Sequence, residues 1–530
     1  MHSGIEKHVA VDERSAAFMA LGIGMESGAP AALVCTSGTA VANYFPAVIE
    51  ARMSGIPMLV LSADRPPNLR NIGANQAIRQ NGIFGEYPVF SHDAGEPVNA
   101  PVDFRRLEIL ANQCWESSVY QNGPVHINFP FRKPLEPESA FLADLERYYG
   151  SALEQRPEPL TKSVRPKNWQ IPAEILTEIA AAQRPVLLAG PLCGYPHLEH
   201  ITTSLQNLGI PALREAGSFR SDSKSASIIG FNAFLKSEET RTLLASDLII
   251  RVGSMPTGKG LELYLNAHQN TPQIRFSGGS EWSDPSLIGG KLVQVPVFES
   301  LDAPKTNKIN ANPDSVQKWQ TISQNWSELR EKNLSVGTPL RDGDVHHCVL
   351  QHLETCHNVM ISNSFSARDI DLFGAPFFEN HRMFMSRGAS GIDGISSTAI
   401  GIALSSDKPT LLITGDLAFL HNTTALLSAR LLQSNSLRII VINNQGGSIF
   451  RMLPVYTEEN WFNTYFETPQ HVNFRTICAG FNVEAQEVTT RDELDRIIQK
   501  PAPNGVSVIV CHTDSDASMQ QRQELWKQIL

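Results

Sequence analysis

The sequence has few cysteines, and none of them stands in a C-x-x-C pair. Its seven cysteines are scattered between Cys35 and Cys511, and their number is odd. A disulfide framework is typical of short secreted chains with an even set of cysteines, and many zinc or redox sites use closely paired cysteines. This chain lacks both patterns, so we expect reduced thiols and a cytoplasmic protein.

Long apolar runs and basic runs are also absent. No stretch of about 18 apolar residues occurs, and charges interrupt the first residues, MHSGIEKHVAVDERS, where a signal peptide has its apolar segment. We therefore predict no membrane span and no export. The net charge is −10 and is spread along the chain, which argues against a nucleic-acid partner.

The sequence does contain a repeated α/β pattern. Short apolar runs alternate with helix-like stretches such as GTAVANYFPAVIEARMSG and LAFLHNTTALLSARLL. The runs are hydrophobic throughout rather than at alternate positions, which indicates strands buried on both faces. These runs span 31–38, 57–64, 185–190, 247–254, 409–416 and 437–444. The predicted fold class is therefore α/β with parallel sheets covered by helices.

The length of the chain indicates several domains. A chain of 530 residues corresponds to about three domains of roughly 150 residues each. Two segments, 151–170 and 301–315, are rich in Pro, Asn and charge and resemble connectors. They predict domains at 1–150, 171–300 and 316–530.

Two of the predicted strands end in polar residues. TGDLAFLHN places Asp416 after one strand, and LRIIVINNQGG places Asn443 and Asn444 after the other, ahead of two glycines. Ligands of open parallel sheets bind beyond the carboxyl ends of the strands. Carboxylate and amide oxygens suit Mg²⁺, whose remaining ligands are phosphate and water oxygens. Glycine lets the backbone approach a phosphate, and a helix start near Leu417 would direct N–H groups at the anion.

The alternative is that Asp416 only caps a helix and that the NN and GG pairs only form a turn. The 27 residues between Asp416 and Asn444, numbered 417–443, have a helix-then-strand pattern. Both motifs at this spacing favour a metal and diphosphate site over the alternative.

The motifs GDL and NNQGG resemble the fingerprint of the thiamin diphosphate-dependent decarboxylase superfamily, with Leu417 where many members have glycine. The resemblance implies thiamin diphosphate as cofactor and Mg²⁺ or Mn²⁺ as the metal. The metal ligands would be the Asp416 carboxylate, the Asn444 side chain and the Gly446 carbonyl. Gly415, Ile392 and Ile449 would also contact the cofactor, with Ile392 supporting its bent conformation.

Longer blocks resemble one family within that superfamily. These blocks are DERSAAFMALG, TSGTAVANYFPAVIEA, LSADRPPNLRNIGANQAIRQNGIFG, SRGASGIDG and NNQGGSIFRMLP. They are similar to the SEPHCHC synthase (MenD) family of menaquinone and phylloquinone biosynthesis. They lie in the outer thirds of the chain, and only PTGK matches in the middle third.

This resemblance implies a transferase that decarboxylates 2-oxoglutarate and adds the remaining four-carbon unit to isochorismate. It also implies three α/β domains, which are pyrimidine-binding, central and diphosphate-binding, and a homodimer or homotetramer.

Glu13 lies between the strand-like stretch HVAV and an apolar helix. A charge in the first turn stabilises any helix, which is the ordinary explanation. The resemblance instead implies that Glu13 is catalytic and hydrogen-bonds the aminopyrimidine ring of the cofactor, so that this ring removes the thiazolium proton. A partly buried carboxyl suits that role.

Both implied substrates are dicarboxylates, so their site needs cations, preferably arginine. Each candidate has an ordinary alternative as a surface charge or a core side chain. The residues that match the family pattern for substrate binding are Asn75, Gln76, Lys259, Ser364, Arg368, Arg387, Phe450 and Leu453.

Two features depart from the family pattern. Gly260 stands where some members have arginine. The chain also starts at the expected second strand of the first domain, so a strand-helix unit of about 35 to 40 residues, which carries a Gly-Ser-Arg loop in the family, is expected to be missing.

The alternative functions are another thiamin diphosphate decarboxylase or carboligase, such as an acetolactate synthase, and an inactive truncated homologue. His346, His347 and Cys348 are contiguous on a predicted helix, and we do not expect these three to converge on one metal ion.

Overall fold

A computed structural model describes residues 4–136, 159–161, 163–220, 227–279, 282, 284–302, 309–334, 339–353, 356–457 and 459–527. The chain forms two compact units, Met1–Arg165 and Pro166–Leu530. None of the helices in these described ranges is long and apolar enough to cross a membrane.

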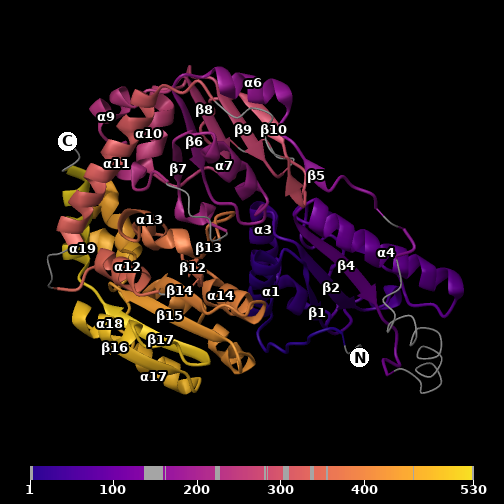
Figure 1. Ribbon diagram of the computed structural model, residues 1–530. Coiled ribbons are helices and arrows are strands. Elements are labelled where there is room, and N and C mark those ends of the chain that lie inside the picture. The colour runs from indigo at the N-terminus through magenta and orange to yellow at the C-terminus, as the bar shows by residue number, and fades with distance from the viewer. Residues whose placement is uncertain are drawn as a thin grey trace. The chain divides into compact units, whose positions relative to one another are not determined.

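The first unit contains a four-stranded parallel sheet in the order β1-β2-β4-β3 (Figure 1). Its elements are α1 (Glu13–Ser27), β1 (Ala31–Cys35), α2 (Thr39–Ala42), α3 (Phe45–Ser54), β2 (Met58–Asp64), β3 (Phe90–Asp93), α4 (Pro101–Tyr120) and β4 (Pro124–Pro130). β1 is an edge strand, so the prediction of burial on both faces is wrong there, and Val34 is 74% exposed.

Two further sequence predictions for this unit need correction. Residues 8–11, HVAV, form no strand. The stretch 38–55 contains two helices rather than one, because α2 ends at Ala42 and Pro46 stands in the first turn of α3.

The second unit begins with a five-stranded parallel sheet in the order β10-β9-β8-β6-β7. Its first elements are β5 (Asn168–Trp169), α6 (Ala173–Ala181), β6 (Pro185–Ala189), α7 (Leu198–Asn207), β7 (Ala212–Arg214) and α8 (Phe231–Phe234). The others are α9 (Glu238–Leu243), β8 (Leu248–Val252), α10 (Lys259–Ala267), β9 (Gln273–Ser277), β10 (Lys291–Gln294) and β11 (Ser300–Leu301). β5 pairs with β11, so the ends of both predicted connectors form a small sheet.

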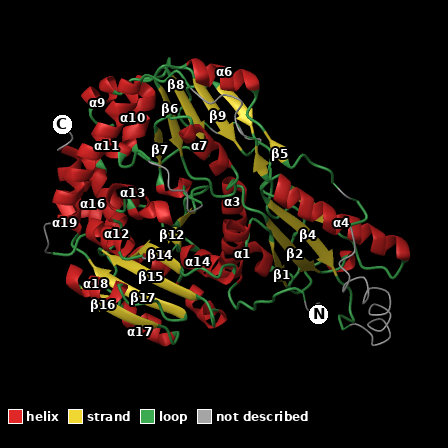
Figure 2. Ribbon diagram, in the orientation of Figure 1, coloured by secondary structure: helices red, strands yellow, loops and turns green. Residues whose placement is uncertain are grey.

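A six-stranded parallel sheet completes this unit, in the order β13-β12-β14-β15-β17-β16 (Figure 2). The helices before and among its first strands are α11 (Pro313–Leu334), α12 (Asp342–Gln351), α13 (Ser366–Phe373), α14 (Ile395–Leu404) and α15 (Asp416–His421). The strands are β12 (Asn358–Ile361), β13 (Arg382–Met385), β14 (Thr410–Gly415), β15 (Ser436–Asn443), β16 (Glu484–Val488) and β17 (Gly505–His512). The last helices are α16 (Glu459–Phe462), α17 (Phe474–Gly480), α18 (Arg491–Ile498) and α19 (Ser515–Lys527).

The three parallel sheets confirm the predicted α/β class, and the predicted runs in the second unit are strands buried on both faces. One helix prediction is wrong. The stretch 417–432 divides at Asn422 into α15 and a 3-10 helix, Thr423–Leu431. Asn422 is buried and its side-chain oxygen accepts a hydrogen bond from the Ser397 N–H of α14, at 2.8 Å. The buried Asn422 side chain is thus bonded to α14 at the point where α15 ends and the 3-10 helix begins.

The central sheet and the C-terminal sheet share apolar cores. One cluster joins Ala216 and Phe219 to β12, β14 and β15, and another joins α8 and α10 to Trp319 and Trp326 of α11. Because burial of apolar area is the main force that holds elements together, these clusters explain why both sheets belong to one compact unit.

Candidate functional site

The carboxyl ends of β12, β14 and β15 border a cavity of about 400 Å³. These strands are neighbours in one parallel sheet, so the residues that follow them lie side by side. The cavity lining includes eleven of the residues predicted from sequence. They are Ser364, Arg368, Arg387, Ile392, Gly415, Asp416, Leu417, Asn444, Gly446, Ile449 and Phe450.

Asp416 is buried at the start of α15. Its carboxylate accepts hydrogen bonds from the N–H groups of Leu417 at 2.7 Å and Gly446 at 2.8 Å. Burial raises the pKa of Asp416 to about 6, these N–H groups oppose the rise, and the charge of Asp342 adds to it. The Leu417 N–H, expected to face an anion, is therefore bonded to the carboxylate of Asp416.

A hydrogen bond to Asp342 orients the Asn444 side chain. Its Nδ2 donates to Asp342 Oδ2 at 3.1 Å, which turns the amide oxygen away from Asp342. Asp342 in turn accepts from Thr513 at 2.7 Å and pairs with Arg522 at 2.6 Å. Burial raises the pKa of Asp342, but Arg522, Thr513 and Asn444 outweigh this effect and the net pKa is lowered. Asp342 was not predicted from the sequence, although it lies in the first turn of α12.

The turn after β15 accepts only glycine. Gly446 has φ +126°, and a Cβ atom there would lie 2.1 Å from the Glu467 carbonyl oxygen. The Gly447 N–H donates to the same carbonyl at 2.6 Å. The Gly446 carbonyl accepts from the Ser448 N–H at 2.9 Å, which leaves its second lone pair for a ligand. At Gly415, no atom lies within 4 Å of a built Cβ position, so the backbone there faces open space.

These residues fit a divalent cation and a diphosphate. The donors are a carboxylate, an amide oxygen and a carbonyl, which are the hard ligands that Mg²⁺ prefers. Burial, backbone N–H groups and the second carboxylate, Asp342, shift the pKa of Asp416. A cation bound there would offset the cost of burying the negative charge of Asp416.

We expect Asp342→Asn to lower Mg²⁺ affinity about 10- to 100-fold, because Asp342 holds the Asn444 amide in orientation. The measurement is enzyme activity as a function of Mg²⁺ concentration. Asp344→Asn is the matched control, since Asp344 is buried in the same helix turn and pairs with Arg341 at 2.8 Å rather than with Asn444. A loss of Mg²⁺ affinity of equal size in both variants would contradict the role of Asp342.

Two arginines line the same cavity. Arg387 donates to Asn363 Oδ1 at 2.8 Å and to Thr257 Oγ1 at 2.7 Å. Arg368 donates to the Ser364 carbonyl at 2.8 Å, and Ser364 has φ +68°, a strained value for serine. The PTGK segment thus meets Arg387 through Thr257, which the sequence reasoning missed.

Lys259 and Leu453 are outside the lining of this cavity. Lys259 lines a neighbouring cavity of about 540 Å³, to which Arg368 also contributes, and its ammonium pairs with Glu262 at 2.6 Å. Glycine at position 260, where some family members have arginine, has a structural reason. A Cβ atom there would lie 2.2 Å from the Asn232 carbonyl oxygen. Leu453 follows the 3-10 helix Ser448–Met452 and is 45% exposed.

Behind the arginines lie two buried carboxyl groups, Glu215 and Asp371. Glu215 accepts from the Thr257 N–H at 2.5 Å, and Asp371 accepts from the Ala216 N–H at 2.7 Å. Burial raises the pKa of Glu215 to about 7, although the Thr257 N–H bond and the charges of Arg387 and Arg368 lower it. Burial and then the charge of Glu215 raise the pKa of Asp371. Glu215 directly follows β7, so the rule that sites lie at strand ends could have found it.

Glu215→Gln is expected to stabilise the protein more at pH 8 than at pH 5. The carboxyl ionises near its ordinary pKa of 4.5 when unfolded and near 7 when folded. The folded state therefore holds the extra proton between these values, and stability falls as pH rises through that window. We expect the variant to gain about 1–3 kcal/mol relative to wild type across it. Urea unfolding at both pH values measures this gain, with exposed Glu299→Gln as the control, and an equal effect at both would contradict it.

The remaining predicted residues lie in the first unit. Glu13 is partly exposed at the start of α1, next to the N-cap Asp12. Burial raises the pKa of Cys35 to about 11, and the Glu13 charge contributes to the rise. Gln76 has φ +59°, and its amide donates to Thr36 Oγ1 at 3.1 Å and to the Ser37 carbonyl at 2.9 Å. The Asn75 carbonyl accepts from Arg65 Nε at 3.3 Å.

Comparisons with known proteins define the class. Residues 1–83 match the family model "Thiamine pyrophosphate enzyme, N-terminal TPP binding domain", and residues 372–511 match "Thiamine pyrophosphate enzyme, C-terminal TPP binding domain". An X-ray structure of a Mycobacterium smegmatis protein described as a thiamin diphosphate-dependent enzyme has the same fold. Its TM-score is 0.62 at 17% identity, with 95% of this chain and 91% of that chain covered. The chain is a thiamin diphosphate-dependent enzyme.

Full-length relatives narrow the class further. The 2-succinyl-5-enolpyruvyl-6-hydroxy-3-cyclohexene-1-carboxylate (SEPHCHC) synthase of Bacillus velezensis is 32% identical, with 99% of this chain and 90% of the relative covered. The synthase of Synechococcus elongatus is 33% identical, with 100% and 90% covered. The chain belongs to the SEPHCHC synthase family.

Proposed function

We propose that this enzyme decarboxylates 2-oxoglutarate and adds the resulting four-carbon unit to isochorismate, which gives SEPHCHC and CO₂. The observation that carries the proposal is the cavity itself, because Arg368, Arg387 and the strand-end carboxylate Asp416 all line it. Two guanidinium groups suit substrates that each carry two carboxylates. Family membership supplies the particular substrates.

Each protein group has a distinct role in this proposal. Asp416, Asn444 and the Gly446 carbonyl would hold Mg²⁺ or Mn²⁺ and, through it, the cofactor diphosphate. When bound, thiamin would supply a carbon nucleophile, and its cationic thiazolium ring would accept the electron pair left by CO₂. Ile392, Ile449 and Phe450 contribute apolar surface to the cavity, which limits water near the reacting atoms. In the first unit, Glu13 would exchange a proton with the cofactor's aminopyrimidine ring.

The two arginines differ in how they are held. Arg387 is bonded to Asn363 and Thr257, which fix its guanidinium between the C-terminal sheet and the central domain. Arg368 is bonded only to a local carbonyl among the bonds described for its guanidinium. We propose that Arg387 positions one substrate carboxylate and that Arg368 binds another, with Lys259 available in the neighbouring cavity. Ser364, Asn75, Gln76 and Leu453 are proposed as further substrate contacts.

The proposal extends to the domains and the assembly. The domain at 1–150 would bind the pyrimidine. The central domain at 171–300 would complete the substrate site, and the domain at 316–530 would bind the diphosphate. We propose a homodimer or homotetramer, in the cytoplasm.

The test is an assay of the purified chain with thiamin diphosphate, Mg²⁺, 2-oxoglutarate and isochorismate, which follows isochorismate loss and CO₂ release together. Equal rates of both, and no product when pyruvate replaces 2-oxoglutarate, are the expected result. CO₂ release from a 2-oxo acid without isochorismate loss would instead assign another decarboxylase or carboligase. The assay is repeated with a version that carries the family's first strand-helix unit ahead of residue 1, and inactivity of both versions would overturn the proposal.

A further inference from the structure

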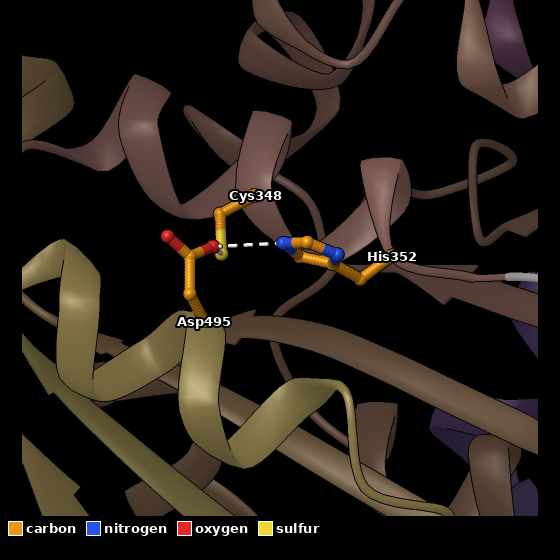
Figure 3. Close-up of side chains that lie close together, drawn as sticks. All are labelled: Cys348, His352 and Asp495. Carbon is orange, nitrogen blue, oxygen red and sulfur yellow. Dashed lines mark hydrogen bonds and ion pairs between the residues drawn. The ribbon is translucent and has the colours of Figure 1, made fainter.

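Cys348, His352 and Asp495 converge outside the linings of the two cavities described above. Cys348 lies in α12, and His352 is the C-cap residue of that helix, four positions later. Residues at i and i+4 share one helix face. Asp495 lies in α18, which contributes to the same apolar core. Figure 3 shows the three side chains pointing toward one another from these two helices.

The donor atoms of these residues are close together. Cys348 Sγ lies 2.8 Å and His352 Nε2 lies 2.9 Å from the same oxygen, Asp495 Oδ1. All three donor atoms lie within 4.8 Å of one another, and in the described ranges this is the one group of three such residues. Thiolate, imidazole and carboxylate are the ligands of zinc in proteins.

The neighbouring residues His346 and His347 do not belong to this cluster, because their side chains bond elsewhere. His346 Nδ1 bonds to the Asp342 carbonyl at 2.8 Å, and His347 Nδ1 to the Phe373 carbonyl at 3.3 Å. The prediction that His346, His347 and Cys348 do not converge on one metal ion agrees with these directions. Cys348 instead finds its partners at i+4 and on another helix, which a search for contiguous ligands cannot detect.

Access to the cluster is one-sided. Cys348 is buried, whereas the side chains of His352 and Asp495 are 24% and 28% exposed. An ion can therefore enter from solvent and keep a water molecule as a fourth ligand. Donor atoms of a tetrahedral zinc site lie roughly 3.3–3.6 Å apart, from the usual bond lengths. The two distances to Asp495 Oδ1 are about 0.4–0.8 Å shorter than this, so these ligands must move apart slightly when an ion enters.

Without an ion, ordinary bonds account for the same contacts. The Cys348 thiol donates to Asp495, and His352 pairs with the same carboxylate. Burial raises the pKa of this thiol far above its usual range, and Asp495 adds to the effect while Arg491 opposes it. A bound ion must therefore displace the thiol proton to solvent. Arg491 Nε lies 3.9 Å from Asp495 Oδ2, and it must stay paired with this oxygen so that Oδ1 can bind the ion.

We propose that Cys348, His352 and Asp495 form a binding site for a thiophilic divalent transition ion, with Zn²⁺ the best match. Such an ion would join α12 to α18. Its role would be structural. By fixing α12, it would help to hold Asp342 at the start of that helix, where Asp342 orients Asn444. Six residues of helix, roughly 9 Å, separate Asp342 from Cys348. The site is distinct from the proposed magnesium site, whose donors are all oxygens.

Cobalt(II) titration tests this proposal. The full chain is stripped with a chelator, kept reduced without a metal-binding thiol, and titrated with Co²⁺ in excess Mg²⁺. The expected result is one equivalent of Co²⁺ with thiolate-to-cobalt charge-transfer absorption, which oxygen ligands cannot give. Zn²⁺ should displace the Co²⁺ and raise the apparent Tm.

Substitutions assign the signal to the cluster. Cys348→Ser should abolish the absorption, and His352→Gln should weaken Co²⁺ binding at least about 10-fold, as loss of a ligand does. Cys478→Ser, another buried cysteine of the same unit, should leave both unchanged. Because the variants could be misfolded, their circular dichroism and urea unfolding without any metal are measured in parallel. No charge-transfer absorption with the wild-type chain, or absorption that persists in Cys348→Ser, would overturn the proposal.

Discussion

Glu13→Gln should lower turnover about 10²- to 10⁴-fold, which is the range for loss of a positioned proton-transfer group. Glutamine has the same size but cannot exchange a proton in this way. The helix start should survive, because Asp12 rather than Glu13 caps α1, through a 3.1 Å bond from the Arg14 N–H. Turnover with 2-oxoglutarate and isochorismate and calorimetric binding of thiamin diphosphate are the two measurements.

The adjacent carboxylate provides a matched control for Glu13. Asn is as good an N-cap as Asp, so Asp12→Asn should retain both α1 and most of the activity. Cofactor binding in Glu13→Gln should stay close to that of wild type, since the diphosphate and metal ligands are untouched. Wild-type turnover in Glu13→Gln, or an equal loss in Asp12→Asn, would show that Glu13 is only a first-turn helix charge.

Asp416→Asn should have a large effect on activity and little effect on stability. Removing the charge of a metal ligand should cost more than the roughly 10- to 100-fold typical for a residue that merely orients a ligand. The stability of the cofactor-free protein should stay close to that of wild type, because the variant removes a buried charge near Asp342 but also loses one of the two N–H bonds that the carboxylate accepts. Activity across Mg²⁺ concentrations and thermal unfolding without cofactor measure the two effects.

The surface variant Asp407→Asn is the control for Asp416, because it removes a carboxylate from the same unit at an exposed position. It should change neither measurement. If Asp416→Asn retains Mg²⁺-dependent activity, Asp416 is only a first-turn charge of α15, whose N-cap is Gly415. If it instead loses activity together with folding, the residue is structural and the metal site must lie elsewhere.

Much of the fold could be predicted because buried parallel strands have a simple signature. The runs that became β6, β8, β14 and β15 are mostly apolar at successive rather than alternate positions, as burial on both faces requires. β1 has the same composition but lies at an edge. Composition reports only hydrophobicity, whereas position in the sheet depends on pairing with distant residues.

The candidate site was predicted where its residues follow strands. Asp416 and Asn444 follow neighbouring strands, so local sequence places them at one sheet edge. Asp342 and Thr257 were missed because they act through tertiary contacts, with Asn444 and Arg387, that no local pattern encodes. Glu215 follows β7, so the strand-end rule could have found it. Lys259 matched a family motif, yet it lies in the neighbouring cavity together with Thr257, and it is Thr257 that bonds Arg387 of the strand-end cavity. Motif position alone does not determine which side chain of a loop points inward.

The most direct test of the central claim is crystallography with thiamin diphosphate and Mn²⁺, whose anomalous scattering locates the ion. We predict one Mn²⁺ bound by the Asp416 carboxylate, the Asn444 amide oxygen and the Gly446 carbonyl, with the diphosphate filling the cavity beyond β14 and β15. An ion at any other position, or a diphosphate bound away from this sheet edge, would contradict the assignment of the site.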